Sequence, residues 1–122
     1  MAKENILKTK SFAFALKTIK TYKEIVKNHK EYVLSRQFLK SGTAIGALVR
    51  EAEFAQSKLD FISKLSIALK ESNETEYWIL LLKQSDYITQ GNANELLSQN
   101  RELTSMLVAS IKTTKNSLQK PH

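Results

Sequence analysis

The stretch KESNETEYWILLL, residues 70–82, decides the fold because it could be either a loop or the middle of a long helix. Its first part is polar, and residues 78–82 form the most apolar run in the sequence. At 100° per residue, one arc collects residues on both sides of the polar part. They are Phe61, Leu65, Ala68, Leu69, Ser72, Glu76, Ile79 and Leu80. No glycine or proline interrupts this segment, so the pattern predicts one continuous helix over residues 58–88.

The same helix carries a second stripe, whose members are spaced alternately by four and three residues. They are Ile67, Glu71, Glu74, Trp78 and Leu81. A helix with two apolar stripes favours two sets of partners. One interpretation is an oligomer interface anchored by Trp78, because tryptophan is favoured at interface centres. The other interpretation is a single wide core face within one chain, and the sequence does not choose between the two.

The rest of the chain also has the periodicity of long helices. The 122 residues include only three glycines and one proline, residues that all-β folds use for turns. Apolar spacings of three and four predict further helices over about residues 6–28, 33–54 and 93–118. The first of these is expected to bury Phe12, Ala15, Ile19, Tyr22 and Val26. The second is expected to bury Leu34, Phe38, Ser41, Ile45, Leu48 and Ala52. The last is expected to bury Leu96, Leu103, Leu107, Ser110 or Ile111, Thr114 and Leu118.

These stripes predict an all-α fold, a bundle of four helices in one domain covering residues 1–122. Two glycines, Gly42 and Gly46, lie inside the second helix, where each costs about 1 kcal/mol relative to alanine. Their spacing of four residues predicts that a neighbouring helix approaches closely at this point.

Local signals predict where the third and fourth helices begin and end. Ser57 followed by Asp60 approximates a capping box at the start of the third helix. Gly91 is placed as the C-cap of that helix. Asn92 with Glu95 is expected to open the fourth helix in the same capping style.

Composition excludes several classes of function. The absence of cysteine excludes a disulfide scaffold, a thiol nucleophile and a thiolate metal site. Only His29 and His122 remain as nitrogen ligands, so we expect no metal site, and no motif indicates a cofactor. No run approaches the roughly 18 apolar residues of a membrane span, and the N-terminus lacks the apolar core of a signal peptide. We therefore expect a cytoplasmic protein.

Lysines gather on one arc of the first helix, and the chain carries a net charge of +7. The arc consists of Lys10, Lys17, Lys20, Lys23 and Lys27. A lysine row on a rigid helix can neutralise several phosphates of RNA or DNA. Because Phe12 and Tyr22 are placed on the inner stripe, we expect contact with the nucleic-acid backbone rather than stacking on bases. The alternative is a solvated face whose charge serves solubility.

Glu76 falls on the core stripe, and a buried carboxylate must be paired or neutralised. Arg36 and Arg50 on the second helix are the expected partners, and Glu51 is close to them in sequence. A structural ion-pair network is one reading, and acid–base work by Glu76 with Glu51 is the other. No nucleophile, metal set or glycine-rich loop accompanies the group, so we expect no catalytic residues and no enzyme activity.

The segment FLKSGTAIGALVREAEFAQSKLDFISKLSIALKESNETEYWILLL, residues 38–82, carries a family resemblance. Its pieces at residues 39–47, 50–52, 60–71 and 74–78 closely resemble the pattern of the 23S rRNA intervening-sequence proteins. The ending SMLVASIKTTKNS, residues 105–117, is similar to the fourth helix of that family. At residue 48 this chain has leucine where the family usually has asparagine.

The resemblance implies an antiparallel four-helix bundle that assembles as a homopentamer, with no attached enzymatic activity. A similar protein is the accessory protein of diversity-generating retroelements, a basic pentameric barrel that binds nucleic acid and a reverse transcriptase. We therefore expect a non-enzymatic oligomeric bundle that binds RNA or DNA through the first helix. The alternative is a protein-interaction scaffold whose charge serves solubility only. The expected partners are copies of the chain, RNA or DNA, and a protein, with no membrane.

Overall fold

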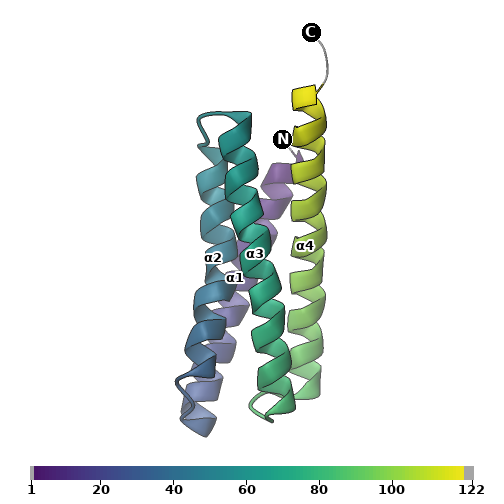
Figure 1. The fold of residues 1–122 in the computed structure, drawn as a ribbon. Coiled ribbons are helices and arrows are strands. Elements are labelled where there is room, and N and C mark those ends of the chain that lie inside the picture. The colour runs from purple at the N-terminus through teal and green to yellow at the C-terminus, as the bar shows by residue number, and fades with distance from the viewer. Residues whose placement is uncertain (1, 120–122) are drawn as a thin grey trace.

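The computed structural model describes the backbone of residues 2–119, which form four α-helices and, within that range, no strand. They are α1 (Ala2–His29), α2 (Leu34–Glu53), α3 (Lys58–Gln84) and α4 (Gln90–Gln119). Short turns join consecutive helices, so their directions alternate and both chain termini lie at the same end of the bundle (Figure 1). Consecutive helices pack extensively against one another, and α1 packs against α4 less extensively. The chain is an up-and-down four-helix bundle.

The helix α3 runs without interruption through residues 70–82, as predicted. The buried face comprises Leu65, Ala68, Ser72, Thr75, Ile79 and Leu82. Ser57 caps this helix, because its side chain accepts a hydrogen bond from the backbone N–H of Asp60 at 3.0 Å. The polar residues of the opening stretch therefore lie on a helix whose register is set by apolar residues before and after them.

The predicted end of the third helix and start of the fourth are wrong. The helix α3 ends at Gln84, and Asp86 takes the left-handed conformation, with φ of 64°. The N–H of Tyr87 then donates to the carbonyl oxygen of Leu82 at 2.9 Å, which closes the helix in a Schellman motif. Aspartate tolerates positive φ better than most residues, so Asp86 ends the helix where Gly91 was predicted to do so.

Thr89 begins the fourth helix in place of Asn92 and Glu95. Its hydroxyl oxygen accepts a hydrogen bond from the N–H of Asn92 at 3.1 Å, and its carbonyl accepts from Ala93 at 2.9 Å. These are the bonds of an N-cap residue. The helix α4 therefore starts at Gln90, and Gly91 lies inside its first turn without a positive φ.

The register predicted for the first helix is also wrong. Its buried residues are Leu7, Ser11, Phe14, Thr18, Thr21 and Ile25. On the predicted stripe, Phe12 is 52% exposed, whereas Ala15, Ile19, Tyr22 and Val26 are only half-buried. The buried Thr18 hydroxyl donates to the carbonyl oxygen of Phe14 at 2.8 Å, so burial leaves it satisfied.

Small residues on both helices explain this choice of face. A Cβ atom built on Gly42 would lie 2.7 Å from Cγ2 of Thr18, and one built on Gly46 would lie 3.3 Å from the carbonyl oxygen of Ser11. The close approach predicted at the two glycines is confirmed, and the neighbouring helix is α1. Leu48 is only half-buried and packs at the edge of the core beside the buried Val49.

Candidate nucleic-acid interface

Two lysines of the predicted arc are engaged in ion pairs with α4. The Nζ atom of Lys10 lies 2.9 Å from Oε2 of Glu102, and that of Lys17 lies 3.0 Å from Oε2 of Glu95. The Lys17 side chain is only 24% exposed. Lys10 and Lys17 therefore lie on the flank of α1 that faces α4, where they connect helices distant in sequence.

The other three lysines of the arc are exposed, and among the described residues none of them has an ion-pair partner. They lie on the C-terminal half of α1, which leads into the turn to α2. Three more exposed cations follow in the chain, one in the turn itself and two in the first half of α2. We call this set the basic end; it comprises Lys20, Lys23, Lys27, Lys30, Arg36 and Lys40. It lies toward the end of the bundle opposite the chain termini (Figure 1).

Lys30 and Lys40 were not predicted as part of a binding surface, and Arg36 was assigned to an ion-pair network. The sequence did contain a signal, because a connection of only four residues between α1 and α2 brings the lysines near the end of one helix close to the cations at the start of the next. Glu24 and Glu31 are the acidic residues within the same stretch of chain.

The turn between α1 and α2 is held in place by Glu31. Its carboxylate accepts hydrogen bonds from the backbone N–H groups of Val33, Leu34 and Ser35 at 2.8, 2.9 and 2.8 Å. The Ser35 hydroxyl in return donates to the carbonyl oxygen of Glu31 at 2.7 Å. Burial by itself would raise the pKa of Glu31, but these hydrogen bonds outweigh it and lower the pKa below its ordinary value.

Glu31 therefore caps the N-terminus of α2 with a charged group, which also interacts favourably with the helix dipole. Lys30, the residue before Glu31, is held in the left-handed region with φ of 53°. The basic end thus includes a turn of defined conformation.

The structure does not bring Arg36, Arg50, Glu51 and Glu76 together, so the predicted ion-pair network is wrong. Glu76 is half-buried and pairs with Arg101 of α4, with Oε1 3.2 Å from Nε. Glu51 pairs with Lys64 of α3 at 3.3 Å. The guanidinium of Arg50 lies over the Phe12 ring, 5.8 Å from its centroid.

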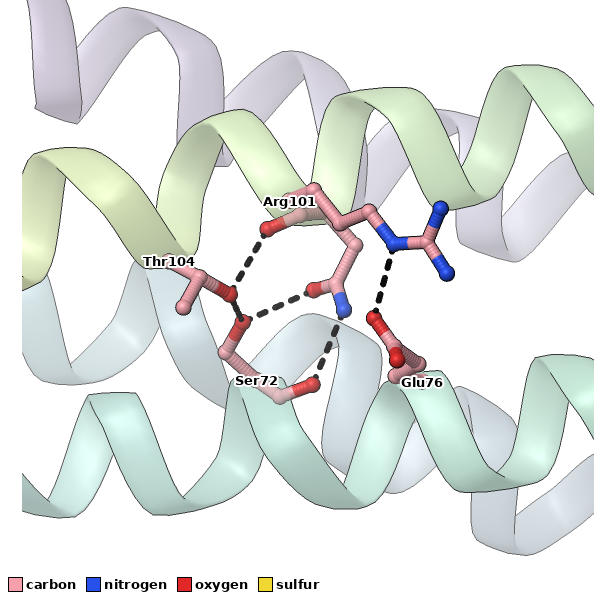
Figure 2. A network of polar contacts seen from close by, with 5 residues as sticks. Ser72, Glu76, Arg101 and Thr104 are labelled. Carbon is pink, nitrogen blue, oxygen red and sulfur yellow. Dashed lines mark hydrogen bonds and ion pairs between the residues drawn. The ribbon is translucent and has the colours of Figure 1, made fainter.

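A buried polar network lies beside the Glu76–Arg101 pair, between α3 and α4 (Figure 2). The Ser72 hydroxyl contacts Oδ1 of Asn100 at 3.0 Å and the Thr104 hydroxyl at 2.6 Å. The Asn100 amide donates to the Ser72 carbonyl at 2.9 Å. Among the described residues, no buried side-chain nitrogen or oxygen lacks a partner. Asn100 was not predicted, and this satisfied network joins two helices.

The second stripe of α3 lies at the border between core and surface. Trp78 is half-buried against the core and meets the Tyr77 ring edge-on, with centroids 5.1 Å apart. Leu81 and Glu71 are half-buried, whereas Ile67 and Glu74 are exposed. Trp78 therefore has partners within its own chain, and part of the stripe remains uncovered.

A cleft of about 1040 Å³ lies between the C-terminal half of α1 and the turn from α3 to α4. It is lined by Lys17, Lys20 and Lys83 and also by Glu24, Asp86 and Glu95, so its charges are balanced, which makes it a poorer phosphate site than the rest of the basic end, to which Lys20 also belongs. The described residues contain no cluster of histidine and carboxylate side chains able to hold a metal, and His122 lies outside them. None of the described helices combines the length and apolarity needed to cross a membrane.

Comparisons with known proteins agree on one family. A crystal structure of a protein of unknown function from the S23 ribosomal protein family of Bacteroides thetaiotaomicron is 49% identical in sequence. The alignment covers 90% of this chain and 98% of that one, with a TM-score of 0.89. No curated protein matches the chain. Residues 3–109 match the family model of the 23S rRNA-intervening sequence protein. The chain therefore belongs to the 23S rRNA-intervening sequence protein family.

Proposed function

We propose that this protein is a non-enzymatic, oligomeric helical bundle that binds the backbone of RNA or DNA through its basic end. The observation that supports the proposal is the concentration of six exposed cations without ion-pair partners among the described residues. Each lysine or arginine that contacts a phosphate releases counterions, so such a surface gives affinity that depends on salt and little on sequence.

The proposal differs from the sequence-based prediction in the residues that carry it. Lys10 and Lys17 are engaged by Glu102 and Glu95, so they contribute less to an external field than the lysines of the basic end. Assembly, which the family resemblance implies as a pentamer, would repeat the basic end in every copy. Simultaneous contact by several copies would then raise the affinity without any new kind of contact.

The test is retention of a labelled RNA or DNA duplex as a function of salt. We expect the triple variant Lys20→Glu, Lys23→Glu and Lys27→Glu to weaken binding. The slope of log affinity against log salt should become shallower by the contribution of about three phosphate contacts. A matched control reverses Lys70, Lys112 and Lys115, which are also exposed and lack described ion-pair partners. Both variants change the charge equally, and circular dichroism checks their helix content.

Equal binding by the two triple variants would contradict the basic end as the site. No binding by the wild-type protein at low salt would remove the proposal altogether. A protein-interaction scaffold is then the remaining candidate. It is supported by two exposed apolar residues at the junction of α2 and α3: Phe54 in the turn, which is 80% exposed, and Leu59 in the first turn of α3. Its test is a pull-down that depends on Phe54 and Leu59 and is insensitive to nuclease.

A further inference from the structure

An exposed aromatic ring lies within the basic end. Tyr32, in the turn between α1 and α2, is 46% exposed and stands in the chain between Lys30 and Arg36. Val33 beside it is 72% exposed. A surface with large apolar groups next to cations suits single-stranded nucleic acid. The apolar groups can stack on the faces of the bases, and the cations can contact the anionic backbone.

Tyr32 differs in its surroundings from Phe12, an exposed aromatic residue of α1. The ring of Phe12 already has the Arg50 guanidinium over it. For Tyr32, no aromatic or cationic partner is found among the described residues. The expectation that bases would not stack on this protein depended on the aromatic rings being buried, and the exposure of Tyr32 removes that ground.

The position of Tyr32 is fixed by its neighbours rather than by the ring itself. The Glu31 carboxylate holds the N–H groups of Val33, Leu34 and Ser35, so the backbone on both sides of the ring is ordered before any ligand arrives. A preorganised contact loses less conformational entropy on binding than a flexible loop would.

We propose that the basic end binds single-stranded RNA or DNA, with an unpaired base stacked on Tyr32 and flanking phosphates held by Lys27, Lys30 and Arg36. This inference rests on the proposed function and narrows its ligand. In a duplex the base faces are covered by their neighbours, so Tyr32 adds affinity only when a base is unstacked. Lysine contacts to phosphate are available in both cases. The property that distinguishes this proposal from backbone contact alone is therefore a preference of the protein for single strands over duplexes that depends on the Tyr32 ring.

Fluorescence anisotropy tests this with a labelled 15-nucleotide strand free of self-complementarity, as RNA and as DNA, and with each strand annealed to its complement. We expect Tyr32→Ala to weaken binding of the single strands about 5- to 150-fold and to leave the duplexes unchanged. Tyr32→Phe keeps the ring and should bind like the wild type. Phe54→Ala removes an exposed aromatic from the turn at the other end and should also bind like the wild type.

Unchanged single-strand binding by Tyr32→Ala would overturn the inference, as would an equal loss for single strands and duplexes. In both cases the lysine triple variant would still report on the proposed function, which stands if that variant loses binding and its matched lysine control does not. If the wild type binds none of the four probes, the proposed function and the inference fail together. Circular dichroism verifies that Tyr32→Ala folds, which is expected because the side chain is exposed.

Discussion

Gly42→Ala tests the close contact between α1 and α2. A methyl group at this position would lie 2.7 Å from Cγ2 and 2.8 Å from Oγ1 of Thr18, closer than van der Waals contact allows. Thr18 is fully buried and β-branched, so its side chain has few alternative rotamers in a helix. Relief requires the helices to separate, or the Thr18 hydroxyl to leave its position 2.8 Å from the Phe14 carbonyl.

The sign of the effect follows from two opposing contributions. Alanine gains about 1 kcal/mol over glycine in a helix interior. Overpacking a closed interface costs about 1–3 kcal/mol, and a displaced buried hydroxyl costs about 1 kcal/mol more. We therefore expect Gly42→Ala to lower the free energy of unfolding by about 1–3 kcal/mol, or the melting temperature by about 4–12 °C for a domain of this size.

Two controls separate the contact from helix propensity. Gly91→Ala places its methyl group where no atom lies within 4 Å, and we expect it to stabilise by up to about 1 kcal/mol. Thr18→Ala removes both clashing atoms, so adding Gly42→Ala to that variant should be neutral or stabilising. Urea titrations followed by circular dichroism measure the wild type and these four variants. A Gly42→Ala variant as stable as Gly91→Ala would refute the close packing of α1 on α2.

Other regions yield their own tests. Glu31→Gln should lower the unfolding free energy by about 0.5–2 kcal/mol at neutral pH in urea titrations. Because the folded-state pKa of Glu31 lies below its ordinary 4.5, the wild-type advantage is present above that value and is lost as pH falls through the folded value; persistence at about pH 2 would contradict this. Asn100→Ala should cost about 2–3 kcal/mol and Ser72→Ala about 1 kcal/mol, since only the former removes the amide; the reverse order on chemical denaturation would count against the network. Trp78→Ala should lower the mass in light scattering while keeping helix content, and a monomeric wild-type protein would exclude Trp78 as an interface anchor.

The sequence predicted the parts of the fold that depend on large aliphatic and aromatic residues. Phe38, Ile45, Leu103 and Leu107 are buried as their spacing indicated, and α3 is continuous because Leu65 and Ile79 hold one face on both sides of its polar segment. Such residues lose favourable burial in every other register. Their pattern therefore determines the helix face with little help from the rest of the fold.

The face of α1 could not be predicted in this way because Ser11, Thr18 and Thr21 occupy it. A hydroxyl bonded to its own helix can be buried at little cost, as Thr18 is through Phe14. A small side chain also permits an approach that larger ones prevent. A hydropathy scale ranks serine and threonine as polar, so a prediction based on it places the Phe12 stripe in the core. In the structure, the glycines of α2 require small residues on the face of α1 that packs against them.

The candidate site was predicted in part, because Lys20, Lys23 and Lys27 belong to the predicted arc, whereas Lys30, Arg36 and Lys40 do not. Whether a lysine is free depends on residues far away in the chain, as Lys17 and Glu95 show. The sequence shows how many lysines the first helix carries, but it does not show which of them form ion pairs with other helices of the bundle. The predicted partners of Glu76 were Arg36 and Arg50 of the second helix, whereas its partner in the structure is Arg101 of the fourth.

The pairing of lysines also predicts how stability and binding separate. Lys17→Glu replaces a 3.0 Å ion pair with a repulsion against Glu95, and we expect it to lower the unfolding free energy by about 0.5–1.5 kcal/mol. Lys23→Glu makes the same change of charge among other cations and gains a favourable i,i+4 pair with Lys27, so its stability should be unchanged or higher by about 0.2–0.5 kcal/mol.

The two variants should have the opposite order of effect on nucleic-acid affinity, because Lys23→Glu should weaken binding more than Lys17→Glu does. Surface ion pairs contribute little to folding, so a cluster of unpaired cations is tolerated, but stability does not account for its presence. If Lys23→Glu also destabilised the protein, its charge would serve the fold. If it leaves stability intact and weakens binding, the basic end is retained for its external field.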